Sequence, residues 1–191
     1  MNILSKLEET KKIVKAKRKR KEYIQYYIDA YGIIPNKKQF EVIESKDNFI
    51  EITFERREGC STAAMIKAIE YAINNQRSRV VLLNAYLGTS NIRIDEMIRM
   101  LSSDALNRHV LRTTKRPNRI QLLNGSIINV VDSKIENFRG ASVDCFIIDT
   151  PKWFRDDQLM NVVRCCTLHN PNSQIISLNQ IESINGQSIN M

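Results

Sequence analysis

The sequence predicts an α/β fold in which a mostly parallel β-sheet carries helices on both faces. Short apolar runs alternate with segments of helical periodicity along most of the chain, which is typical of this class. One apolar run leads through a glycine-containing turn directly into a helix, the arrangement of a phosphate-binding loop. The 191 residues, 42% of them hydrophobic, are enough for one packed domain.

The amino-terminal residues 1–46 are predicted to form a basic helical appendage to a core at 47–191. Apolar residues recur at helical spacing within 3–31, where Gly32 ends the run, and Pro35 and Asn36 open a second, short helix. The appendage carries eight positive charges with no acidic residue among them: Lys11, Lys12, Lys15, Lys17, Arg18, Lys19, Arg20 and Lys21. Because the chain has 29 Lys and Arg against 21 Asp and Glu, the remainder is formally neutral. This segment could therefore bind nucleic-acid phosphate, or it could be a solvated helix face.

The first half of the core begins with a buried strand at 49–54, followed by the turn ERREG and a helix STAAMIKAIEYAI. The continuous apolar run at 79–85 predicts a strand of a parallel sheet, and a helix is expected from Ile92 to Leu101.

The second half contains a predicted hairpin at 119–132, because Asn124 and Gly125 separate two apolar runs. The run at 145–149 predicts a buried strand that ends on Asp149. A helix at 156–168 and a final strand at 174–178 complete the alternation.

The expected location is the cytoplasm. The amino terminus has no signal-peptide core and no apolar run of 18 residues predicts a membrane span. The four cysteines lack paired CxxC spacing with histidine partners, which predicts reduced thiols and no zinc site.

The turn before the helix at 61–73 has part of the chemistry of a phosphate-binding loop. In such a loop glycine lets backbone N–H groups approach phosphate, lysine adds a charge, and a hydroxyl ligates magnesium. Gly59, Cys60 and Ser61 occupy those places, so the lysine is absent, and Phe54 stands where a first glycine is usual. The alternative interpretation is an ordinary strand–turn–helix connection with Ser61 as the helix N-cap.

Six landmarks occur in order: Gln39, the ERREGCST turn, the NGS hairpin, the FRG loop, the FIID strand and the ISLN strand end. Together they resemble the ATPase domain of viral terminase large subunits, the DNA-packaging motors of tailed phages and herpesviruses. The resemblance covers about residues 36–186 and implies a P-loop NTPase-like fold, with ATP and Mg²⁺ as cofactors if the site is active. The family's second, nuclease domain has no counterpart here, so we expect no nuclease activity.

The resemblance implies roles for individual residues. Gln39 matches the glutamine that contacts adenine, and Arg56, with Arg57 as neighbouring candidate, matches an arginine near the γ-phosphate. Gly59 and Ser61 match the loop glycine and the magnesium-ligating hydroxyl, with Thr62 as the alternative in register. The remaining matches are Asp149, which would hold magnesium through water, and Ser177 and Asn179 in the region that couples hydrolysis to movement.

Two departures from the family pattern predict impaired hydrolysis. Cys60 cannot supply the lysine charge, and Thr150, where the family commonly has glutamate, has no accessible pKa for a general base. Each loss is expected to cost about 10²-fold or more in rate. Arg56 or Arg57 could replace the missing charge, and Glu58 lies in the same turn.

Three functions remain open at this stage. The chain could be a packaging-motor subunit that works in a homo-oligomeric ring on double-stranded DNA, with a small terminase subunit, a portal or a separately encoded nuclease as partners. It could instead be a non-hydrolysing binding or assembly module that keeps the fold. The third possibility is a basic nucleic-acid-binding protein whose core is only a scaffold.

Overall fold

The computed structural model describes residues 24–84, 88–132, 142–151 and 157–181. Residues 11–21, the FRG loop and the end of the chain lie outside these ranges, so the predictions for them stay predictions. Among the described helices, none is long and apolar enough to cross a membrane.

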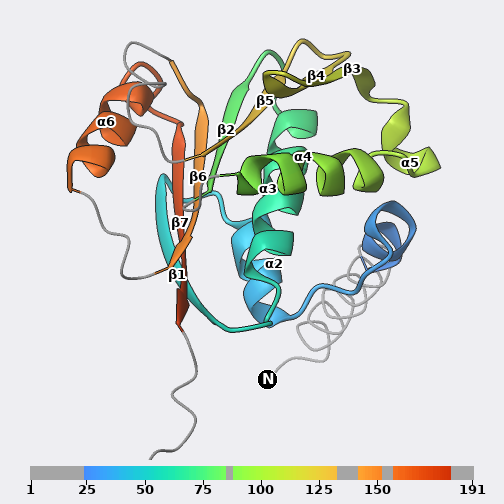
Figure 1. Cartoon of the computed structure of the whole chain (residues 1–191), viewed down its shortest axis with the longest axis horizontal. Helices are drawn as coiled ribbons and strands as arrows, with labels where there is room; N and C mark the ends of the chain where they lie inside the picture. The colour runs from blue at the N-terminus through green and yellow to red at the C-terminus, as the bar shows by residue number, and fades with distance from the viewer. Residues whose placement is uncertain (1–23, 85–87, 133–141, 152–156, 182–191) are drawn as a thin grey trace, which may run out of the picture.

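A seven-stranded sheet forms the centre of the molecule (Figure 1). Its strand order is β1-β7-β6-β2-β5-β4-β3. Strands β1, β7, β6, β2 and β5 all run in the same direction, whereas β4 is antiparallel to both β5 and β3. The strands are β1 (Phe49–Glu55), β2 (Arg79–Asn84), β3 (Val110–Lys115), β4 (Asn118–Leu122), β5 (Ile127–Asp132), β6 (Cys145–Pro151) and β7 (Gln174–Ile181). The predicted α/β class with a mostly parallel sheet is confirmed.

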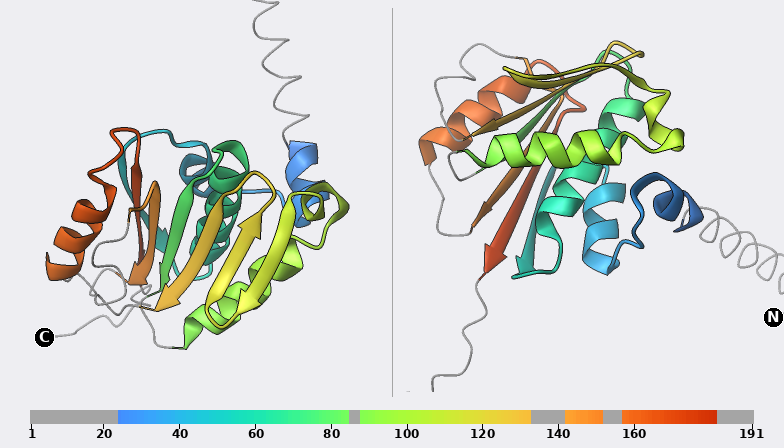
Figure 2. Two further views of the ribbon diagram at one scale, coloured as in Figure 1. Left: turned by 90° about the horizontal axis from the view of Figure 1, so that it is seen from above. Right: turned by 45° about the vertical axis from the view of Figure 1, so that its right-hand side comes forward.

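Helices cover both faces of this sheet, as the views in Figures 1 and 2 show. One face carries α3 and α4, with α2 packed on α3, and the other carries α6. Residues 24–31 are also helical. The labelled helices are α2 (Lys37–Glu44), α3 (Cys60–Asn74), α4 (Thr89–Met100), the short α5 (Asp104–Asn107) and α6 (Asp157–Thr167).

The central strands are buried on both sides because their side chains alternate between two hydrophobic clusters. On β2, Val80 and Leu82 join the cluster beneath α3, while Val81 and Leu83 join the cluster beneath α6. The same alternation continues on β6. This explains why these strands are continuous apolar runs in the sequence.

The described part of the amino-terminal region packs tightly on α3. Tyr27 and Val42 are fully buried, and the hydroxyls of Tyr26 and Tyr31 both donate hydrogen bonds to the Glu70 carboxylate at 2.8 and 2.7 Å. The segment from residue 24 onward therefore belongs to the same hydrophobic core as the sheet.

The predicted hairpin is confirmed, and its NGS motif anchors the end of α3. Gly125 has a φ of 85°, which glycine adopts without steric cost. The Asn124 amide donates hydrogen bonds to the Ala72 and Ile73 carbonyls, and the Ser126 hydroxyl donates one to the Asn75 carbonyl. These bonds satisfy carbonyls that a helix terminus leaves unpaired.

Several predicted details are wrong. Phe49 is 52% exposed because β1 is an edge strand, so β1 is not uniformly buried. Strand β6 continues two residues past Asp149, and β7 includes Asn179, which the sequence placed just beyond the strand. Strand β3 and α5 have no counterpart in the predictions; half-exposed edge strands such as β3 leave little apolar signal.

Candidate nucleotide site at the start of helix α3

The turn between β1 and α3 is shaped by Gly59. This residue is the N-cap of α3 and has a left-handed φ of 81°, so Ser61 is not the N-cap. A Cβ at this position would overlap the Nε2 atom of Gln39. Glycine is therefore required here both for its backbone conformation and for the close approach of a side chain.

Gln39 is buried and bonded to backbone at both ends of its amide. Its Oε1 accepts from the Asn36 N–H at 2.9 Å, which forms a capping box with the Asn36 side chain at the start of α2. Its Nε2 donates to the Gly59 carbonyl at 3.1 Å. In this structure Gln39 therefore joins α2 to the phosphate-loop-like turn.

The Glu58 side chain forms hydrogen bonds within the turn and to α2. Its carboxylate accepts hydrogen bonds from the Glu55 N–H and from the Lys38 ammonium, both at 2.6 Å. The bond from Lys38, together with the one from Glu55, lowers the pKa of Glu58 below its ordinary value. Lys38, which sequence reasoning missed, is thus the lysine that contacts this turn.

Arg56 and Arg57 lie on the outer side of the turn and are exposed. Arg57 has a left-handed φ of 71°, an uncommon conformation for a residue with a side chain. Within the described residues, neither arginine has a hydrogen-bond or ion-pair partner. Both are free to approach a ligand, and neither is held against α3.

Cys60 is the first residue of α3 and lies against Asp149. The two come from the segment after β1 and from β6, and the Cys60 thiol donates a hydrogen bond to the Asp149 Oδ1 at 3.5 Å. Burial, and then the negative charge of Asp149, raise the pKa of the Cys60 thiol far above its ordinary value. The thiol stays protonated at neutral pH, so it contributes neither a positive nor a negative charge.

Arg93 of α4 fills the space between Ser61 and Asp149. Its Nη2 donates to the Ser61 hydroxyl at 2.7 Å, its Nη1 donates to Glu96 at 2.8 Å, and its Nε lies 3.8 Å from the Asp149 Oδ2. Sequence reasoning missed Arg93 and Glu96 because they lie on a helix without any motif, about thirty residues after the turn. Only the packing of α4 beside α3 brings them to the site.

Helix α4 is held at its start by Asp132, the last residue of β5. The Asp132 carboxylate accepts from the N–H groups of Gly88 and Ser90, both at 2.9 Å, and from the Ser90 hydroxyl at 3.0 Å. An anionic side chain at a helix amino terminus is favourable because it meets unpaired N–H groups and the positive end of the helix dipole. This contact fixes the position from which Arg93 reaches Ser61.

The residues that would hold magnesium do not fit a divalent ion as they stand. The Ser61 hydroxyl and the Asp149 carboxylate already contact the Arg93 guanidinium, and a second cation between them would be repelled by it. Asn84, in register with Asp149, adds one buried amide oxygen without a partner among the described residues. Mg²⁺ prefers six oxygen ligands in a nearly ideal octahedron, and no group of three or more His, Cys, Asp or Glu residues in the described ranges could hold a metal.

The other predicted site residues lie near this centre but do not all meet. Thr62 is half-buried in the first turn of α3. Thr150 lies in β6, in register with Asn179 of β7. Asn179 is buried and its amide donates to Glu51 of β1 at 2.6 Å, while Ser177 is half-buried two residues earlier. Asn179 therefore ties β7 to the strand that leads into the turn.

A second basic region lies on the described part of the fold, in addition to the predicted one at 11–21. The segment 108–119, which includes β3 and the start of β4, has five basic residues and no acidic one. They are Arg108, Arg112, Lys115, Arg116 and Arg119, of which the first four are exposed. The formally neutral charge of the core is thus unevenly distributed.

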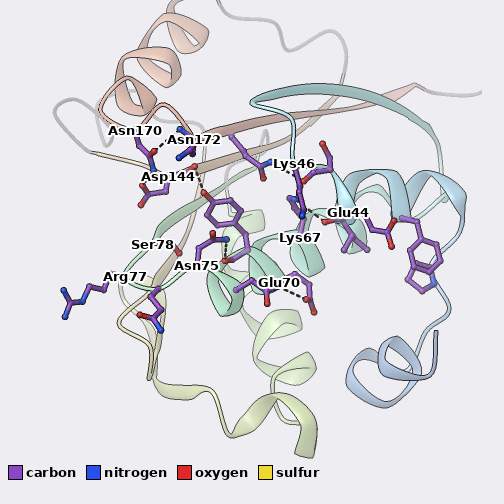
Figure 3. A pocket seen from close by; sticks show the side chains of 18 of the residues that line it. Glu44, Lys46, Lys67, Glu70, Asn75, Arg77, Ser78, Asp144, Asn170 and Asn172 are labelled. Carbon is purple, nitrogen blue, oxygen red and sulfur yellow. Dashed lines mark hydrogen bonds between the residues drawn. The ribbon is translucent and has the colours of Figure 1, made fainter. Parts of the chain in front are cut away.

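A large groove of about 1510 Å³ lies elsewhere, at the amino-terminal edge of the sheet, which is the end where the parallel strands begin (Figure 3). Ser78 and Asp144, which precede β2 and β6, line it together with the buried Lys67 of α3. Lys67 donates to the carbonyls of Ile43 and Ser45 at 3.2 and 2.6 Å, and burial lowers its pKa. Open α/β sheets bind ligands at the opposite, carboxyl edge, where Ser61, Arg93 and Asp149 meet.

Several solved structures that share this fold are phage large terminases. The HK97 bacteriophage large terminase matches with a TM-score of 0.68 and 12% identity over 83% of this chain and 37% of that chain. The ATPase domain of the Thermus phage P74-26 large terminase matches with a TM-score of 0.60 and 13% identity, over 81% of this chain and 68% of that chain. The large terminase of a further, thermophilic bacteriophage in complex with ATP-gamma-S matches with a TM-score of 0.56 and 12% identity, over 75% and 37%.

Sequence comparison gives no such match: no protein-family model and no curated protein matches the chain. The chain spans little more than a third of the length of the HK97 terminase and of the terminase bound to ATP-gamma-S. The likeness therefore resides in the overall arrangement of strands and helices. This chain has the fold of the ATPase domain of phage large terminases.

Proposed function

We propose that this chain is the ATPase-fold module of a viral DNA-packaging motor, and that it binds nucleotide at the start of α3 but hydrolyses it slowly or not at all. The fold supports the packaging context. The observation that carries the impaired hydrolysis is the contact of the neutral Cys60 thiol with Asp149, at the place where a phosphate loop has its lysine.

Nucleotide binding is supported by groups that do not depend on the missing lysine. The first N–H groups of α3 have no partner within the helix, and the positive end of its dipole favours an anion. Gly59 adds no side chain of its own at this end of the helix, and the neighbouring Gln39 amide donates to the Gly59 carbonyl. Arg56 and Arg57 are exposed on the same turn and could approach phosphate.

Slow hydrolysis follows from the chemistry of phosphoryl transfer, in which the protein contributes mainly positioning and charge stabilisation. Cys60 supplies no charge, and Thr150 supplies no base at the position where the family commonly has glutamate. Glu58 does not fill this role as it stands, because its carboxylate is bonded to Lys38 and the Glu55 N–H.

As a motor module the chain would work on double-stranded DNA in a homo-oligomeric ring in the host cytoplasm. A small terminase subunit, a portal or a separately encoded nuclease would be its partners. The second candidate is a non-hydrolysing assembly module that contacts DNA or an acidic protein through residues 11–21; the absence of the lysine and the glutamate favours it.

The test is titration calorimetry with ATP and Mg²⁺, together with phosphate release with and without double-stranded DNA. The native chain is compared with a variant carrying Cys60→Lys and Thr150→Glu. We expect the native chain to bind ATP and to release phosphate at least about 10²-fold more slowly than the variant. DNA-stimulated turnover by the native chain would refute impaired hydrolysis, whereas DNA binding without ATP binding would support the assembly module instead.

A further inference from the structure

We propose that Arg93 takes the place of the divalent metal in this site, so that nucleotide phosphates bind there independently of Mg²⁺. The inference rests on the proposed nucleotide-binding role. It identifies Arg93 as the cation that contacts the phosphates. Nothing in the turn sequence assigns Arg93, which comes from α4.

The position of the guanidinium is the first argument. It lies between the Ser61 hydroxyl and the Asp149 carboxylate, the two groups that a phosphate-loop site uses around a metal ion. A metal there would have to displace Arg93 from both of them. Because Arg93 is always charged, the displacement would move a cation away from Asp149 in order to place another beside it.

The second argument is that Arg93 is held in place. Glu96, one turn further along α4, accepts a hydrogen bond from its Nη1, and the Arg93 side chain is only 25% exposed. The start of α4 is itself fixed by Asp132 through three hydrogen bonds. A cation on such a support is pre-organised and need not be ordered when an anion arrives.

The third argument is the hydrogen-bonding capacity of a guanidinium. It presents five N–H donors in a planar fork that matches phosphate oxygens. In Arg93 the Nη1 and Nη2 groups each use one of their two N–H donors, on Glu96 and Ser61, which leaves one donor on each; the Nε is buried and lies 3.8 Å from Asp149. Donors therefore remain for a phosphate that approaches the start of α3.

The experiment is calorimetric titration of the full chain with ATP, once in EDTA and once in Mg²⁺. We expect the two dissociation constants to differ by less than about threefold. Arg93→Gln should weaken binding in EDTA by about tenfold or more, the loss expected for one charge-assisted contact, and Arg93→Lys should recover part of it. Arg99→Gln is the matched control, because Arg99 is an exposed arginine on the same helix.

A nucleotide-free readout accompanies this titration. Mn²⁺ binding, followed by the loss of its free-ion electron paramagnetic resonance signal, is compared between the native chain and Asp149→Asn. We expect no difference, since Arg93 already neutralises Asp149. Circular dichroism establishes whether each variant is folded. If Arg93→Gln is unfolded, Ser61→Ala, which removes one of the Arg93 contacts, replaces it in the titration.

Four results would overturn the inference. They are binding that is at least tenfold tighter in Mg²⁺ than in EDTA, Mn²⁺ uptake that depends on Asp149, an ATP affinity that is unchanged in Arg93→Gln, and no ATP binding by the native chain. A strict Mg²⁺ requirement would leave the proposed function intact. DNA-stimulated turnover in the native chain is the separate observation that would refute the proposed impaired hydrolysis, whereas absence of ATP binding would refute both the inference and the proposed nucleotide binding.

Discussion

At the scale of single residues, Gly59 shows how tightly the turn before α3 is determined. Its φ of 81° is a conformation that other residues rarely adopt, and Gln39 occupies the space next to its Cα. Gly88, the N-cap of α4, has a similar φ of 85°, but among the described residues no atom lies within 4 Å of where its Cβ would be. Substituting each glycine therefore distinguishes two costs of adding a side chain. The backbone cost applies at both positions, and the steric cost applies only at Gly59.

We predict that Gly59→Ala destabilises the protein more than Gly88→Ala does. The left-handed backbone alone should cost about 1 kcal/mol in each variant. In Gly59→Ala the new methyl group should add about 1–3 kcal/mol, because Gln39 must leave its hydrogen bonds or the turn must shift. Urea unfolding of both variants measures the difference. In a Gln39→Ala background the extra cost should disappear; its persistence would show that Gln39 is not the obstacle.

Single residues also determine the charges around Asp149. The Cys60 thiol, which carries no charge, contacts Asp149 on one side, and the cation nearest to Asp149 is Arg93 on another helix.

At the scale of elements, Asp144 connects neighbouring strands at the amino-terminal edge of the sheet. This residue precedes β6, and its carboxylate accepts hydrogen bonds from the Arg79 N–H at the start of β2 and from Asn170 before β7, at 2.8 and 2.9 Å. Burial alone would raise the pKa of Asp144. The bonds from Asn170 and Arg79, together with the nearby His169, outweigh that effect and lower the pKa below its ordinary value.

We predict that Asp144→Asn lowers the free energy of unfolding by about 1–2 kcal/mol at pH 7, since bonds to a charged group are lost. A carboxyl group whose pKa is lower in the folded state stabilises that state above its unfolded pKa, and the effect disappears as pH falls through the folded pKa. The difference between native and variant should therefore shrink as pH falls below the ordinary aspartate pKa of about 3.9. Denaturant unfolding at pH 7 and pH 3 measures it.

Asp47→Asn is the control for this prediction, because Asp47 is an exposed aspartate near the same groove. It should change stability little at either pH. A difference between native and Asp144→Asn that stays constant with pH would mean that packing, and not the charge of Asp144, stabilises this edge.

At the scale of the whole molecule, the two ends of the sheet have different roles. The carboxyl edge brings together Ser61, Arg93 and Asp149, whereas the amino-terminal edge carries the groove of Figure 3. Basic residues add two further regions, 11–21 in the amino-terminal segment and 108–119 around β3.

We predict that double-stranded DNA binding depends steeply on salt and that residues 11–21 supply most of this dependence. Each contacted phosphate contributes about 0.9 to the slope of log K against log salt concentration. Changing the eight basic residues of 11–21 to Gln should flatten the slope by several units. Changing the five basic residues of 108–119 to Gln is the matched control and should reduce it less. Fluorescence anisotropy of labelled DNA at several salt concentrations measures the slope for each variant. A larger decrease of the slope in the 108–119 variant would assign DNA binding to the β3 region.

The sequence by itself determined the fold class, because apolar runs such as those of β2 and β6 alternate along the chain with segments of helical periodicity. It also determined the turn before α3 and the NGS hairpin, where glycine and asparagine favour particular backbone conformations over a few residues. The half-exposed edge strand β3 lacks such a local signal. Likewise, the true ends of β6 and β7 depend on pairing with neighbouring strands.

Only the tertiary structure decided what surrounds Asp149. The sequence indicated Gly59, Cys60, Ser61 and Asp149 as site residues, but it offered no reason to connect them with Arg93. That contact requires α4 to pack beside α3 with its start fixed by Asp132, and such an arrangement depends on contacts between residues far apart in the chain. Local sequence patterns specify helices, strands and turns; they do not specify which side chain of one helix reaches the end of another.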